Sequence, residues 1–192
     1  MNGRSHPRLL GLGPFAARYH GAVDVDEELA EALLAIAQIA LGLAGFGGVF
    51  VAVGRGGAAE RRPADTYRLV LLLTTALATL ALSFLPVTLR ALGLEGSSVW
   101  RLASALLAAV VAALLFVFRR WRLRYLDEIR EGEAAWVATG VLLVFAGLVA
   151  AELLNAAGAF GARAAGVFFV GLVSLVTFGS YLFARMLFLW RS

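Results

Sequence analysis

The sequence contains no cysteine, no lysine and only two histidines, His6 and His20, both close to its beginning. Without cysteine the chain can form no disulfide and has no thiolate to bind a metal or attack a substrate. No histidine lies in an apolar segment, where it could ligate haem, copper or zinc. We therefore expect neither a metal site nor a cofactor.

Charged residues are also scarce, at 16% of the 192 residues, against about 25% in ordinary soluble domains. Hydrophobic residues make up 61% of the chain. This composition excludes a soluble globular domain and a disordered chain. The net charge of +4 comes from arginines between apolar segments, where membrane topology explains them. We expect an integral membrane protein that binds no nucleic acid.

Five apolar segments are long enough to cross a bilayer as helices, which requires about 20 residues each. The strands of a transmembrane barrel are about half as long and alternate apolar with polar residues, which these segments do not. The sequence therefore predicts an all-α, polytopic transmembrane bundle, 24–192, after a polar N-terminal tail, 1–23. Asp24 or Asp26 is expected to be the N-cap of an acidic first turn that leads into the first apolar segment. The expected helices are residues 30–54, 68–91, 98–120, 134–157 and 164–190.

The arginines predict the orientation of this bundle. If the connections 55–67 and 119–133 and the C-terminus share one side, that side holds eleven arginines and the other side holds six. Because arginine-rich connections stay in the cytoplasm, the N-terminus is expected outside and the C-terminus inside.

The first predicted helix is rich in small residues, and we expect it to be the most buried of the five. Small residues let helices approach closely in lipid. Their face serves either packing inside the bundle or an interface between subunits, including a pore-lining face. The predicted helix-packing face comprises Ala37, Ala40, Ala44, Gly45, Gly48 and Ala52.

A few polar residues inside the apolar segments are candidates for a polar core or a permeation pathway. Gln38 is expected to point inward, either as a structural hydrogen bond or as a pathway ligand. Glu152 is expected near the outer end of its helix, with Asn155 on the same face. It is either paired with Arg101 or an ionisable group at the mouth of an aqueous pathway.

Thr79 and Ser83 lie beside Pro86 in the second predicted helix. Their hydroxyls can bond to carbonyls that proline leaves free, or they can line a polar path.

Four arginines follow the third apolar segment and are expected on a helical extension next to the bilayer. Each can gain about 1 kcal/mol from an anionic lipid surface. A solvated helix whose charges pair with one another is the alternative. The candidate headgroup-binding residues are Arg119, Arg120, Arg122 and Arg124.

The stretch IAQIALGLAGF, residues 36–46, resembles the first helix of uncharacterised small polytopic membrane proteins of bacteria. The likeness extends over about the first 110 residues, through FLPVTL and SVWRLAS. It implies a multi-pass protein of the bacterial inner membrane and brings no activity with it.

The chain shows no catalytic motif, phosphate-binding loop or metal-binding pattern, so we expect a protein that is not an enzyme. One reading is a small channel or permeation pathway that self-assembles as a homo-oligomer. The other is an accessory or scaffolding subunit that packs against a different membrane protein. A secondary transporter is a weaker third reading, because five helices contain no paired repeat. In each case the surrounding partners are membrane lipids.

Overall fold

The computed structural model describes residues 13–53, 63–124 and 135–189, and within them the chain is entirely helical. The first three helices are α1 (Gly13–Val53), α2 (Pro63–Ala91) and α3 (Ser97–Arg124). They are followed by α5 (Ala135–Ala156), the single 3₁₀ turn η1 (Gly161–Arg163) and α6 (Ala164–Leu189). Five of these helices are long and apolar enough to span a membrane, which confirms the predicted all-helical fold and its five candidate spans.

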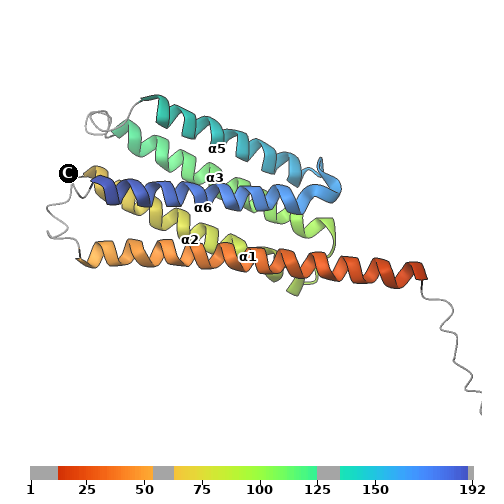
Figure 1. Cartoon of the computed structure of the whole chain (residues 1–192). Coiled ribbons are helices and arrows are strands. Elements are labelled where there is room, and N and C mark those ends of the chain that lie inside the picture. The colour runs from red at the N-terminus through yellow and green to blue at the C-terminus, as the bar shows by residue number, and fades with distance from the viewer. Residues whose placement is uncertain (1–12, 54–62, 125–134, 190–192) are drawn as a thin grey trace, which may run out of the picture.

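The helices run up and down, roughly parallel to one another (Figure 1). The helix α6 contacts each of the other four long helices, whereas α1 contacts α2 and α6, and α5 contacts α3 and α6. The expectation that the first helix is the most buried is wrong, since α2 has the largest buried share. Only one side of α1 faces other helices, whereas α2 is packed against α1, α3 and α6.

The first helix also begins much earlier than predicted. It starts at Gly13, inside the segment 1–23 that was expected to be a polar tail, so neither Asp24 nor Asp26 caps it. With 41 residues at 1.5 Å each, α1 is about 60 Å long, twice the hydrocarbon thickness of a bilayer. Its N-terminal part extends beyond the other helices (Figure 1). The polar residues there do not end the helix, because glutamate and alanine favour helix.

Two tight turns join helices at the end of the bundle from which α1 projects. After α5, Gly158 has φ +91°, its amide donates to the Asn155 carbonyl, and the Ala159 amide donates to the Leu154 carbonyl. The turn after α2 repeats this pattern around Gly93, which has φ +88°. Glycine is required at both positions because a left-handed residue ends each helix while its last carbonyls are satisfied.

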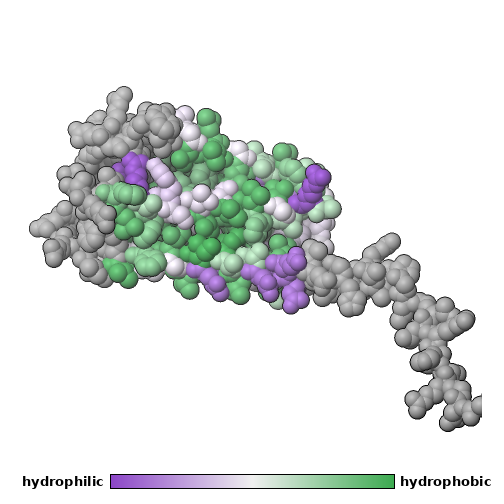
Figure 2. Space-filling model, in the orientation of Figure 1, coloured by the Kyte–Doolittle hydropathy of each residue, from purple (hydrophilic) through white to green (hydrophobic). Residues whose placement is uncertain are grey.

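The surface matches a membrane protein. Hydrophobic residues cover the middle of the bundle, and hydrophilic residues gather mainly toward its ends and along α1 (Figure 2). The core is filled by large apolar side chains from several helices, including Leu72 from α2, Leu107 from α3, and Phe168 and Leu172 from α6. The turns and packing together bring one set of polar side chains into this core.

Candidate functional site: a buried polar cluster and an apolar cavity

Three polar side chains, Ser104, Glu152 and Asn155, meet between α3, α5 and α6 and are completely buried. Glu152 and Asn155 stand three residues apart and therefore share one face of α5. Ser104 comes from the second turn of α3. Sequence analysis missed Ser104, although it is a lone hydroxyl in the middle of an apolar stretch, which was the available signal. We call these three residues the polar cluster.

Asn155 ties the cluster together. Its Nδ2 donates to Ser104 Oγ at 2.7 Å and to the carbonyl of Ala164, the first residue of α6, at 2.8 Å. One amide thus joins α5 to both neighbouring helices. Polar bonds of this kind hold helices together in lipid, where the hydrophobic effect does not.

Glu152 lies beside these bonds without taking full part in them. The Ser104 side chain interacts with its carboxyl group, but neither carboxylate oxygen has a hydrogen-bond partner of good geometry among the described residues. A buried carboxyl group in this condition is uncommon, because an unpaired polar group in an apolar medium is costly. In a membrane helix such a group is a candidate functional site.

The backbone of α6 closes over this carboxyl at Gly171. A Cβ atom at position 171 would lie 2.5 Å from Glu152 Oε1 and 2.5 Å from Leu107 Cδ2. A side chain at position 171 would therefore force Glu152 or Leu107 to shift, and glycine lets α6 approach the cluster without that. Glu152 and Leu107 both meet α6 at this glycine, and both are completely buried.

The ion pair expected between Arg101 and Glu152 is not formed. Arg101 Nε instead donates to the Ala156 carbonyl at 3.0 Å, and Nη2 donates to the Ala157 carbonyl at 3.5 Å. The last carbonyls of a helix lack partners within it and carry partial negative charge, so a cation is favourable there. Arg101 thus caps α5. The complete burial of Glu152 also means that it does not lie at an open mouth.

Thr79 and Ser83 are buried on α2, but their hydroxyls do not replace the bond that Pro86 removes. Thr79 Oγ1 donates to the Thr75 carbonyl, and Ser83 Oγ donates to the Thr79 carbonyl, both at 2.8 Å. The carbonyl that Pro86 leaves without a donor is that of Leu82, further along the helix. These hydroxyls bond to their own helix, and neither joins the polar cluster.

The residues expected on one packing face of α1 divide between two faces. Ala37 and Ala40 are buried and Ala44 is half-buried, whereas Gly45 and Gly48 are exposed with no atom of a neighbouring helix within 4 Å. Gln38 is exposed as well, so the expectation that it points inward is wrong. The small residue of α1 that packs closely against the core is instead Gly47. A Cβ atom placed at this position would lie 2.9 Å from a methyl group of Leu73 on α2. The side chain of Ala52 lies outside the described residues.

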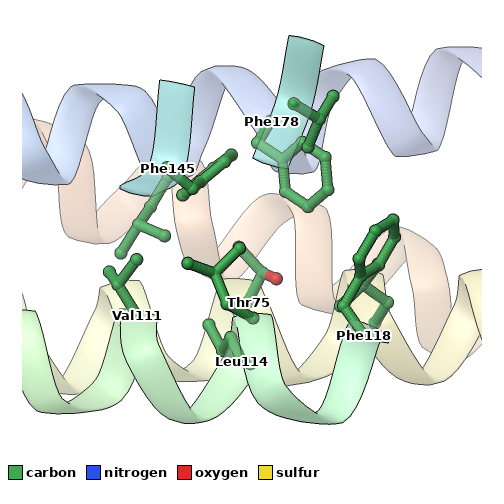
Figure 3. Close-up of a pocket in the computed structure, with 10 residues that line it drawn as sticks. Thr75, Val111, Leu114, Phe118, Phe145 and Phe178 are labelled. Atoms are coloured by element: carbon green, nitrogen blue, oxygen red, sulfur yellow. The ribbon is translucent and has the colours of Figure 1, made fainter. Parts of the chain in front are cut away.

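An apolar cavity lies between α2, α3, α5 and α6 (Figure 3). It is nearer the end of the bundle where α3 ends, after Arg119 and Arg120, which we call the arginine-rich end. Its free volume is about 20 Å³, enough for one small group. The Thr75 hydroxyl faces an otherwise apolar lining and has no hydrogen-bond partner among the described residues. Phe145 and Phe178 close the opposite side and pack edge to face, with ring centroids 5.0 Å apart. This cavity does not reach the polar cluster, because none of the three cluster residues is among the residues that line it.

The four candidate headgroup arginines lie in the last turns of α3. Arg119 and Arg120 are exposed there, and the side chains of Arg122 and Arg124 lie outside the described residues. Within the described part of the chain, no three histidine, cysteine or acidic side chains come close enough to hold a metal ion.

Comparison with known proteins found no matching family model, no matching curated protein and no matching solved structure. The function is therefore inferred from the chemistry of these residues.

Proposed function

We propose that this protein is a non-catalytic, multi-pass protein of the bacterial inner membrane that self-assembles through the outward face of α1 and forms a small permeation pathway between copies. One observation carries the proposal: Gln38 lies exposed in the apolar part of α1 beside glycines with nothing against them. We call Gln38, Gly42, Gly45 and Gly48 the outward α1 face.

The spacing of these residues suits a helix–helix interface. Gln38, Gly42 and Gly45 follow one another at four and three residues, which places them on one stripe of the helix. No neighbouring side chain or backbone atom lies within 4 Å of a Cβ placed on Gly42, Gly45 or Gly48. A second helix can therefore approach the backbone of α1 closely along this stripe.

The amide of Gln38 gives such an association a polar element. An amide in hydrocarbon has no water to bind, so it gains from a hydrogen bond across an interface. When copies associate around this stripe, their Gln38 amides meet and offer donors and acceptors to a permeating species.

The interior of one bundle supports a pathway between copies rather than through a single chain. Leu107, Leu172 and Leu175 are at most 1% exposed and fill the core between the polar cluster and the apolar cavity. The buried hydroxyls of Thr79 and Ser83 on α2 donate to carbonyls of their own helix rather than to the polar cluster. A hydrated species has no route there at this packing density.

An accessory subunit of a larger membrane complex is the second candidate, and a specific observation favours it. Most of the exposed side chains on α1 are apolar, with Ile39, Leu41, Phe46 and Val49 all more than half exposed. A pathway lined by these residues would be polar only at the level of Gln38 and apolar along the rest of α1. A single helix of a different protein would equally well cover the glycines and bind Gln38.

The experiment is native mass spectrometry of the protein gently extracted from its own membrane, with Gly45→Leu as the variant. Gly147→Leu on α5 is the matched control, since Gly147 is exposed and also has nothing within 4 Å. We expect a closed homo-oligomer of the parent chain and of Gly147→Leu, and its loss in Gly45→Leu. A stoichiometric foreign chain would establish the accessory role instead, and a lone monomer would overturn both.

Flux through reconstituted vesicles separates a channel from a mere oligomer. Gln38→Leu should abolish ion or solute flux that the parent oligomer supports. Glu152→Gln should leave it unchanged, because the carboxyl group is sealed inside one bundle. Equal flux in the parent and Gln38→Leu would contradict the proposed pathway.

A further inference from the structure

A second hollow opens on the surface between α2 and α3, beside the apolar cavity. Its volume is about 270 Å³. It shares Leu71 and Leu114 with the cavity shown in Figure 3. We call it the α2–α3 groove, and it is lined by Tyr67, Val70, Leu71, Thr74, Ala78, Val110, Ala113, Leu114, Val117 and Trp121.

The lining of the groove suits a hydrocarbon. Its one aliphatic hydroxyl, on Thr74, donates to the Val70 carbonyl of its own helix at 2.7 Å. That hydroxyl therefore has no proton left to donate to an occupant. The other residues along the middle of the groove are alanine, valine and leucine, which offer only dispersion contacts.

The groove has the length of one leaflet. The two helices run antiparallel, so Tyr67 of α2 and Trp121 of α3 lie at one end, and Ala78 and Val110 lie at the other. At 1.5 Å per residue the groove is about 16 Å long. The hydrocarbon core of a bilayer is about 30 Å thick, so the groove reaches from one interface to about the midplane.

Aromatic and basic residues mark the interfacial end. The rings of Tyr67 and Trp121 stack with centroids 5.5 Å apart, and such amphipathic rings lie at headgroup level in membrane proteins. Arg68 and Arg120 follow and precede these two aromatic residues in the sequence, and Arg120 is exposed. A helix turns by about 100° per residue, so Arg120 lies at the flank of the groove, about 80° from the middle of its α3 face, whereas Arg119 lies on the opposite side of α3.

From this combination of length, lining and charge we propose that the α2–α3 groove binds one acyl chain of an anionic phospholipid, with the headgroup phosphate at Arg120. The lipid comes from the leaflet at the arginine-rich end of the bundle. Arginine pairs with phosphate through two parallel hydrogen bonds, which gives the site a preference that a merely apolar surface lacks. This site is independent of the outward α1 face.

Filling the groove tests the acyl-chain part of the proposal. Ala113→Phe places a ring in the groove, and Ala112→Phe makes the same change on an exposed position of α3 outside it. The purified protein would be delipidated in detergent and titrated with phosphatidylglycerol, and bound lipid would be counted by native mass spectrometry. We expect Ala113→Phe to weaken binding of the first lipid at least tenfold, while Ala112→Phe binds like the parent.

Charge removal tests the headgroup part. Arg120→Gln should weaken phosphatidylglycerol binding at least fivefold more than Arg119→Gln, although each removes one exposed charge from the same turn. Phosphatidylcholine should bind more weakly than phosphatidylglycerol to the parent chain. Unchanged melting temperatures of all four variants show that the fold is kept.

Three outcomes would overturn the proposal. Equal lipid binding by Ala113→Phe and Ala112→Phe would place the lipid outside the groove. Equal effects of Arg120→Gln and Arg119→Gln would reduce the charge contribution to general attraction, and equal binding of the two lipids would remove the anionic preference. A variant that fails to fold is replaced by the milder Ala113→Leu with Ala112→Leu, for which the same ranking is expected.

Discussion

At the scale of single residues, Glu152 and Gly171 depend on each other. The carboxyl group occupies the space that any side chain at position 171 would need, and its oxygens have no good hydrogen-bond partner in the described structure. A glycine there weakens α6 as a helix but allows the close approach of α6 to α5. Asn155 then holds the three helices at this distance through its two hydrogen bonds.

Gly171→Ala tests this close approach. The added methyl group would overlap Glu152 and Leu107, so we expect the free energy of unfolding to fall by about 1–3 kcal/mol, the usual cost of overpacking a core. Thermal unfolding in lipid nanodiscs measures it. Gly166→Ala is the control on the same helix, because Gly166 is exposed with nothing within 4 Å. It should be neutral or slightly stabilising, and equal losses in the two variants would disprove the argument.

At the scale of elements, the end of α5 is secured from two directions. The turn at Gly158 satisfies its last carbonyls from within the chain, and Arg101 of α3 satisfies two more from outside. The planar guanidinium lies against this turn, since a Cβ at position 158 would be 3.5 Å from Arg101 Cζ. The arginine that was expected to neutralise Glu152 is used to close a helix end, because backbone carbonyls there have no other donor.

Arg101→Gln should therefore loosen the end of α5 without affecting its middle. Loss of a cation at a helix C-terminus costs about 0.3–1 kcal/mol. We expect amide hydrogen exchange at residues 154–159 to become up to about fivefold faster. Arg163→Gln removes the same charge from the neighbouring turn, where no side-chain bond to α5 is involved, and should leave that exchange rate unchanged. Faster exchange across the whole of α5 would instead mean that Arg101 supports the bundle in general.

At the scale of the whole molecule, α1 and α3 end, and α2 and α5 begin, at the same end of the bundle (Figure 1). The two glycine turns lie at the other end. This arrangement is what the arginine count requires, since eleven arginines then fall on one side. The predicted orientation puts that side in the cytoplasm.

Cysteine labelling tests the orientation directly, because the parent chain has no cysteine to react in the background. We expect Ala159→Cys, in the exposed turn after α5, to react with an impermeant maleimide in intact cells. Ala58→Cys should react only after the membrane is made permeable. The reverse pattern would invert the proposed topology, and the lipid in the α2–α3 groove would then come from the outer leaflet.

The class of this protein and the ends of most helices follow from the sequence alone. A long apolar run with no alternation must be a membrane helix, since backbone polar groups in lipid have to bond within the segment. The predicted boundaries of the second to fifth segments lie within a few residues of α2, α3, α5 and α6. The start of α1 was missed because polar residues continue a helix past the membrane as readily as they end one.

Only the tertiary structure decided which face of each helix lies inside. It placed Gln38 and Gly45 outside, assigned Arg101 to the end of α5, and brought Ser104 and Gly171 to Glu152. In a soluble protein, the polar face of a helix reveals which side meets water. In a bilayer the solvent is as apolar as the core, so leucine and alanine are equally suited to both, and the sequence pattern carries no such signal. The hydrogen-bond partner of each polar group then depends on which helices pack beside it, and this is known only from the tertiary structure.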